Sequence, residues 1–130
     1  MITEDYVSFE TAKLLKEKGF NIPTERFYNE HVSWRAASAS NWNDEGGEDC
    51  SCPTIQMAIK WLREVHNLAI ATYLKADGWH SGVSQIKFNG EGFIVDIIDG
   101  IDDGNIPNCD TYEEAAEAAI KYCLENKLIF

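Results

Sequence analysis

The clearest hydrophobic pattern lies between Pro53 and His66, in the stretch PTIQMAIKWLREVH. Its apolar residues recur at intervals of three and four, which places them on one face of a helix with 3.6 residues per turn. Pro53 suits the first turn, where its missing N–H is not needed, and Asn67 ends the pattern. We therefore predict a central helix over residues 53–66 whose buried face consists of Ile55, Ala58, Ile59, Leu62 and Val65.

A second helical pattern covers residues 7–19 and carries a signal at each end. Ser8 can cap the first turn, because its hydroxyl can accept from a free backbone N–H group. Gly19 can adopt the left-handed conformation that ends a helix, with Phe20 folding back onto Leu15. The spacing therefore predicts an N-terminal helix that stops at Gly19.

The last helix has the strongest start signal in the chain. Thr111 and Glu114, three residues apart, form a capping box, and Glu113 suits the positive end of the helix dipole. A stripe of small and apolar residues, including Cys123, follows at helical spacing. This stripe predicts a helix that packs closely against a sheet or against the central helix, with Cys123 in the core.

Alternation of apolar and polar residues predicts three strands between these last two helices, over residues 68–74, 84–88 and 93–98. A turn around Trp79 and His80 separates the first two strands, and Asn89-Gly90 favours a tight hairpin between the second and the third. The expected core residues of the second and third strands are Ser84, Ile86, Phe88, Phe93, Val95 and Ile97.

The segment before the central helix is less regular. Residues 26–36 are rich in aromatic side chains and favour a short hairpin around Asn29 and Glu30. Residues 37–52, ASASNWNDEGGEDCSC, are small, polar and acidic, which predicts a long mobile loop.

Together these elements predict an α+β fold with an antiparallel sheet that carries helices on one face. Residues 53–128 form an α-β-β-β-α core, preceded by the N-terminal helix and hairpin of residues 1–36 and by the acidic loop of residues 37–52. A chain of 130 residues fits a single domain over residues 1–130.

Composition narrows the classes of partner. The 22 acidic and 11 basic side chains give a net charge of −11, which disfavours binding to a phosphate backbone, because such binding depends on Lys and Arg. The sequence has no apolar run of about 20 residues for a membrane span and no basic N-terminal region followed by an apolar one. We therefore expect a cytoplasmic protein with a protein partner.

Two resemblances bear on fold and function. The element order from Pro53 to Leu128 resembles the topology of the double-stranded RNA-binding domain, although Tyr112, Glu113 and Glu114 stand where that family has phosphate-binding lysines. The segments SFETAKLLKEKGF, CPTIQMAIKWLREVHN and TYEEAAEAAIKYCLENKLI together resemble a set of short uncharacterised prophage-associated proteins of gut bacteria. The first resemblance implies a nucleic-acid binder, and the second implies an accessory protein of a mobile element.

Cysteines provide one candidate site. Cys50 and Cys52 precede the central helix, whose free N–H groups can stabilise a thiolate at Cys52, while the neighbouring carboxylates oppose a second negative charge. Adding Cys109 gives a possible three-thiol metal site, with His31, His66 or His80 as a fourth ligand. The spacing matches no known zinc pattern, and unrelated thiols are the competing interpretation.

A calcium loop is a further alternative for residues 99–110. Asp99, Asp103 and Gly104 occupy the first, fifth and sixth positions of such a loop, whereas Ile101 and Asp110 depart from its pattern. The competing interpretation is a solvated acidic loop.

Aromatic residues in loops provide the remaining candidates. Trp34, Trp42 and Trp79 lie in or near predicted loops of an acidic chain, and exposed aromatic side chains commonly anchor a protein partner. The sequence contains no phosphate-binding loop, GxSxG motif or HExxH motif. The sequence thus favours a protein-interaction module without a cofactor over an enzyme, with metal binding and nucleic-acid binding as alternatives.

Overall fold

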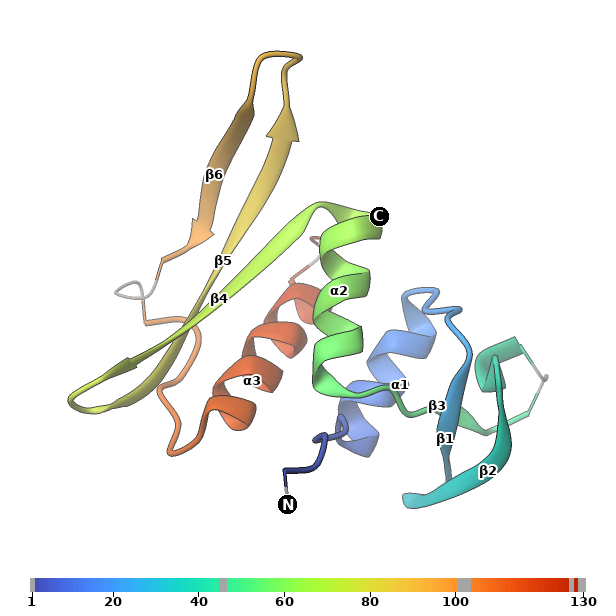
Figure 1. The fold of residues 1–130 in the computed structure, drawn as a ribbon. Coiled ribbons are helices and arrows are strands. Elements are labelled where there is room, and N and C mark those ends of the chain that lie inside the picture. The colour runs from blue at the N-terminus through green and yellow to red at the C-terminus, as the bar shows by residue number, and fades with distance from the viewer. Residues whose placement is uncertain (1, 45–46, 101–103, 127, 129–130) are drawn as a thin grey trace. The chain divides into compact units, whose positions relative to one another are not determined.

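The computed structural model describes residues 2–44, 47–100, 104–126 and 128. These residues contain three α-helices and two antiparallel sheets of three strands each, which confirms the predicted α+β class (Figure 1). The chain divides into two compact units, Met1–Ala58 and Ile59–Ile129. The expected single domain over residues 1–130 stays a prediction. No helix in the described part of the chain is both long and apolar enough to cross a membrane.

Helix α1, Phe9–Glu17, begins and ends as its sequence predicts. The hydroxyl of Ser8 accepts a hydrogen bond from the backbone N–H of Thr11 at 3.3 Å. Gly19 has a φ of 90°, and the N–H of Phe20 donates to the carbonyl of Leu15 at 3.0 Å. Phe20 is buried, so its ring closes the end of the helix as expected.

The sheet of the first unit has the order β2-β1-β3, with β1 over Thr24–Asn29, β2 over Val32–Ser40 and β3 over Cys50–Ser51. The predicted hairpin is confirmed and is longer than expected. Its turn consists of Glu30 and His31, whose φ angles are 53° and 74°. Residues other than glycine rarely adopt this left-handed region, so both positions carry backbone strain.

The prediction of a long loop over residues 37–52 is wrong for the described residues. Strand β2 extends to Ser40, and a 3₁₀ helix, η1, covers Trp42–Asp44 before β3. Side chains tie this segment down: the Trp42 indole N–H donates to the carbonyl of Thr24 at 2.8 Å, and the Asn43 amide donates to that of Phe20 at 2.9 Å. Composition alone does not reveal such long-range bonds.

Helix α2, Ile55–His66, belongs to the first unit up to Ala58 and to the second from Ile59 onward. All of its predicted core residues are buried except Val65, which is exposed. Val65 follows Arg63 and Glu64, which are also exposed, so its assignment to the core is wrong. Asn67, with a φ of 57°, ends the helix.

The sheet of the second unit has the order β4-β5-β6, with β4 over Leu68–Lys75, β5 over Gly78–Phe88 and β6 over Phe93–Asp99. The turn between β4 and β5 contains Ala76 and Asp77 alone, so the predicted turn around Trp79 and His80 is wrong. Trp79 instead pairs with Leu74, and its backbone exchanges two hydrogen bonds with Cys109 at 2.8 and 2.9 Å.

Helix α3, Tyr112–Glu125, lies against β4 and β5 on one face of this sheet. Its predicted cap is confirmed, because the hydroxyl of Thr111 accepts from the N–H of Glu114 at 3.1 Å. The hydroxyl of Ser81 on β5 donates to the carbonyl of Ala115 at 2.8 Å, so α3 covers the face to which Ser81 and Val83 point.

Candidate functional site

The three candidate tryptophans have different surroundings. Trp34, on β2, is 54% exposed and is free to contact a partner. The ring of Trp42 stacks on Phe27, with centroids 4.3 Å apart, and its indole N–H is bonded within the first unit. Trp79 lies in the second unit, where its ring meets Tyr112 edge-on at 5.7 Å. Trp42 and Trp79 therefore also have packing roles.

The candidate thiols lie in two different units. Cys50 and Cys52 are buried in the first unit and Cys109 is partly exposed in the second. Burial raises the pKa of the Cys50 thiol, although the ammonium groups of Lys16 and Lys13 oppose this shift. The described residues contain no cluster of three His, Cys, Asp or Glu side chains suited to a metal ion. The three-thiol metal site therefore receives no support from the described residues.

The predicted calcium loop falls partly on residues 101–103, which lie outside the described residues. The described Asp99 is buried, and one of its carboxylate oxygens accepts from the Asn105 amide at 2.6 Å. Its other oxygen is buried and lacks a hydrogen-bond partner among the described residues.

A cavity of about 650 Å³ opens in the first unit between α1, the β1–β2 turn and the start of β3. Its walls include the rings of Phe9 and His31, whose centroids are 4.0 Å apart, and the thiol of Cys50. The ammonium group of Lys16 donates to the carbonyls of Gly47 and Asp49, both at 2.8 Å, and so fixes the segment that borders the cavity. Burial thus disfavours the thiolate form of Cys50, which is the form that acts as a nucleophile.

A smaller cavity of about 310 Å³ lies in the second unit beside the β4–β5 turn. Asp77 and the ring of His80 are joined there by a hydrogen bond of 2.7 Å, which is the main cause of the lowered pKa of Asp77. Among the described lining residues none carries a hydroxyl or thiol group that the pair could activate as a nucleophile, and Lys75 supplies an amine.

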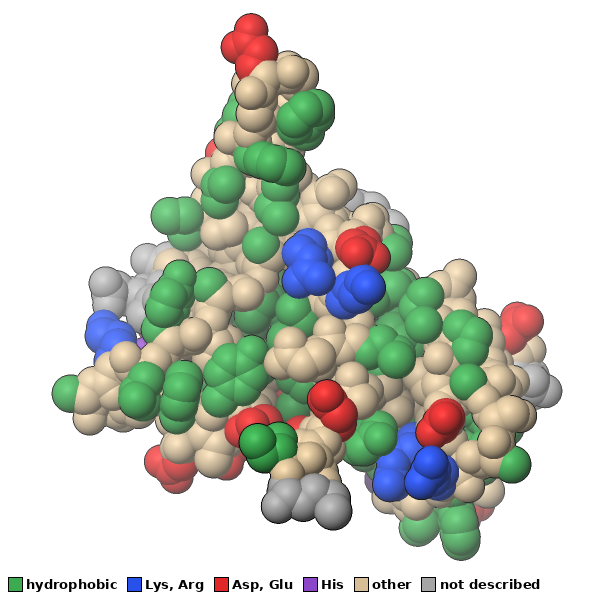
Figure 2. Space-filling model, in the orientation of Figure 1, with side chains coloured by type: hydrophobic (Ala, Val, Ile, Leu, Met, Phe, Trp, Pro, Cys, Tyr) green, Lys and Arg blue, Asp and Glu red, His purple; other side chains and the backbone are tan. Residues whose placement is uncertain are grey.

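The largest departure from the predicted burial is the open face of the β4–β5–β6 sheet, opposite α3. We define the open face by five apolar residues of the β5–β6 hairpin: Ile86, Phe88, Phe93, Val95 and Ile97. Phe93 and Ile97 are each 73% exposed, Phe88 is 68% exposed and Val95 is 58% exposed. Figure 2 shows hydrophobic side chains gathered along this hairpin. Ile86, at the base of the hairpin, is partly buried.

The register explains why these side chains share a face. Phe88 pairs with Phe93, Ile86 with Val95 and Ser84 with Ile97. Directly paired residues of an antiparallel sheet point to the same side, so the three pairs form one continuous apolar strip with Ser84 at its base. The rings of Phe88 and Phe93 are in contact, with centroids 5.5 Å apart.

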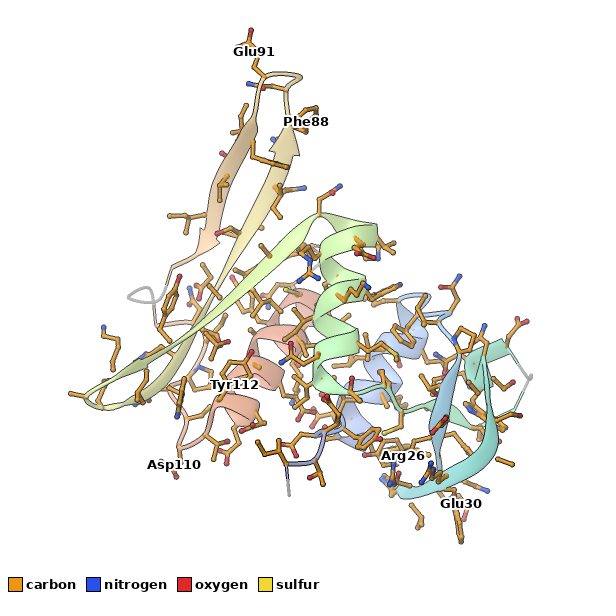
Figure 3. The ribbon with its side chains drawn as sticks, in the orientation of Figure 1. Arg26, Glu30, Phe88, Glu91, Asp110 and Tyr112 are labelled. Carbon is orange, nitrogen blue, oxygen red and sulfur yellow. The ribbon has the colours of Figure 1, made fainter. Side chains whose placement is uncertain are left out.

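The β5–β6 hairpin extends beyond the point where β4 begins. Leu68, the first residue of β4, pairs with Gln85, so the residues of β5 after Gln85 pair with β6 alone (Figure 1). Figure 3 shows Phe88 on the side of this hairpin and Glu91 at its tip. The opposite side carries a polar contact, an ion pair of 3.4 Å between Lys87 and Asp96. The two sides of the hairpin therefore differ in character.

The alternating pattern identifies these residues but assigns them to the core, and this assignment is wrong. The covered face of β5 carries Ser81 and Val83, whereas Ile86 and Phe88 lie on the other side. Alternation shows which residues share a face and that the face is apolar, but not whether the chain itself covers it. Exposure of the face is the new information that the structure provides.

Comparisons with protein-family models, with curated proteins and with solved structures give no match for this chain.

Proposed function

We propose that the protein is a protein-interaction module that binds its partner through the open face of the β4–β5–β6 sheet. The supporting observation is the exposure of Phe88, Phe93, Val95 and Ile97 on one continuous strip. Monomeric proteins rarely leave a contiguous apolar surface without a ligand or partner. Burial of one such side chain is worth roughly 1.5–3 kcal/mol, so three of them supply several kcal/mol to an association.

The predicted contact residues fit this proposal to different degrees. Trp34 is exposed on the first unit, whereas Trp42 and Trp79 have packing partners within their own units. The resemblance to prophage-associated proteins supports an accessory role for such a module in a mobile element. A cytoplasmic location is part of the same proposal.

Site-specific photo-crosslinking in the cells that produce the protein tests the proposal. A benzophenone amino acid at Ile97 is expected to give a discrete adduct with another protein. The matched control carries the same probe at Glu113, which is exposed on α3 in the same unit, and is expected to give none. A second control, Val95→Glu combined with the probe at Ile97, is expected to suppress the adduct. Equal adducts from both positions, or none from Ile97, would contradict the proposed function.

A further inference from the structure

We infer that the partner is an extended segment with basic flanks, which adds as a further strand to the free edge of β6. This inference rests on the proposed function and specifies how the open face is occupied. Strand β6 is the last strand of its sheet, with β5 on one side and no described strand on the other. Edges of this kind are templates for the addition of a strand from another chain.

The hydrogen-bond pattern of the hairpin shows which backbone groups face the free edge. The N–H of Asn89 donates to the carbonyl of Gly92 at 3.1 Å, which makes this a bonded pair. Bonded and non-bonded pairs alternate along an antiparallel ladder, so the next pair, Phe88 with Phe93, is non-bonded.

The same alternation continues along β6 as far as the pair of Ser84 with Ile97, beyond which the register shifts. The pair of Ile86 with Val95 is again non-bonded, and the N–H of Ile86 accordingly donates away from β6, to the carbonyl of Asn67 at 2.8 Å. The backbone N–H and C=O groups of Phe93, Val95 and Ile97 therefore point away from β5 and toward the free edge. These groups can form a ladder with an added strand without breaking any bond to β5.

The residues that offer these backbone groups also carry the exposed side chains. Phe93, Val95 and Ile97 point their side chains onto the open face. Alternate residues of an added strand would lie beside them on that face, so apolar residues at every second position of the partner would extend the strip. This coincidence favours an extended occupant over a helix, which would leave the edge groups unpaired.

Charge defines the flanks of the occupant. The hairpin carries Glu91 at its tip and Asp96 on β6, and Asp96 is paired with the ammonium group of Lys87. The whole chain has a net charge of −11. The negative charge of this chain therefore attracts a partner that carries Lys and Arg beside its apolar positions. It repels a second copy of this acidic chain and an anionic lipid surface.

Selection from a displayed library of random twelve-residue peptides, with the full chain as bait, tests the chemistry of the occupant. We expect the enriched peptides to carry apolar residues at every second position and more Lys and Arg than Asp and Glu. Enrichment of apolar residues at helical spacing, an excess of acidic residues, or no enrichment at all would overturn the inference. Sedimentation of the bait alone tests whether a second copy of the chain occupies this edge. We expect no self-association through the edge. Self-association that Val95→Pro abolishes would assign the edge to a second copy.

Backbone participation is tested with the most enriched peptide in synthetic form. Amide exchange of the wild-type protein is expected to slow at least about tenfold at Phe93, Val95 and Ile97 on binding, and little at Ile94 and Asp96, which are already bonded to β5. Val95→Pro removes one outward N–H and is expected to weaken binding about tenfold, whereas Val95→Thr keeps the N–H and is expected to weaken it less.

The amide-exchange measurement uses the unmodified chain, so it stays decisive if Val95→Pro fails to fold. Unchanged exchange at Phe93, Val95 and Ile97 in the peptide complex would overturn strand addition. If the exchange is unchanged but the probe at Ile97 still gives an adduct, the open face remains the proposed interaction surface and only the addition of a strand is refuted. Absence of the adduct would remove the proposed function itself.

Discussion

Replacement of Ile97 and of Ile120 by alanine compares the same change on the open face and in the core of one unit. Ile97 is 73% exposed and Ile120 is fully buried. Full burial of an isoleucine side chain is worth roughly 1.5–3 kcal/mol, so the quarter of Ile97 that is covered contributes about 0.5 kcal/mol. The weaker strand preference of alanine adds up to about 1 kcal/mol, so the expected cost of Ile97→Ala is below about 1.5 kcal/mol. Ile120→Ala opens a cavity and is expected to cost about 2–5 kcal/mol.

Urea unfolding, followed by the NMR signals of the second unit, gives both free energies of unfolding on one scale. Measurements at two protein concentrations separate the stability of the chain from any contribution of self-association. A cost for Ile97→Ala that equals or exceeds that of Ile120→Ala would show that the open face is covered in solution. That result would refute the assignment of the open face as a free binding surface.

Three further predictions concern the rest of the second unit. Thr111→Ala removes the hydroxyl that caps α3 and is expected to lower the free energy of unfolding by about 1 kcal/mol, whereas Thr111→Ser is expected to retain most of it. Gly78→Ala places a Cβ atom 2.8 Å from the carbonyl oxygen of Cys109 at a φ of 130°, and its melting temperature is expected to fall further than that of Gly90→Ala, which has a φ of 90° and open space around the added atom. Burial raises the pKa of Cys123 from 9.0 to about 12, so the unfolded chain releases this proton first as the pH rises. The free energy of unfolding is therefore expected to fall as the pH rises between these two pKa values, by up to about 1.4 kcal/mol per pH unit. Urea unfolding of Cys123→Ala over the same pH range is expected to lack this decrease.

Local signals predicted the helices well because the interactions that end a helix involve neighbours in the sequence. The stop at Gly19 and the cap at Thr111 each depend on residues within five positions, and both are confirmed. The hairpin predicted at Asn89-Gly90 forms, but its turn is centred one residue later: Gly90 has a φ of 90°, Asn89 has no positive φ, and the N–H of Asn89 donates to the carbonyl of Gly92. Interactions between residues this close in the sequence can be predicted from the sequence alone.

Long-range contacts account for the failures. The bond from Trp42 to Thr24 spans 18 positions and the bonds from Lys16 to Gly47 and Asp49 span more than 30, so composition could not predict the order of that segment. The alternating pattern predicts that the residues of the open face share one side of the sheet, but it places them in the core. An apolar face gives the same sequence pattern whether the chain itself or a partner covers it. The backbone N–H and C=O groups that point to the free edge of β6 can be identified only from the pairing register, and the register is known only from the structure.

The turn at Glu30 and His31 has a consequence for the order of folding. Most two-residue hairpin turns use asparagine and glycine, which tolerate positive φ and let the hairpin start from its turn. Here both positions oppose the required backbone, so the turn is a poor nucleus, and the ring of His31 gains its contact with Phe9 only when α1 is in place. The β1–β2 hairpin is therefore expected to form after α1 docks, and substitution of Asn-Gly at these two positions should accelerate refolding of the first unit.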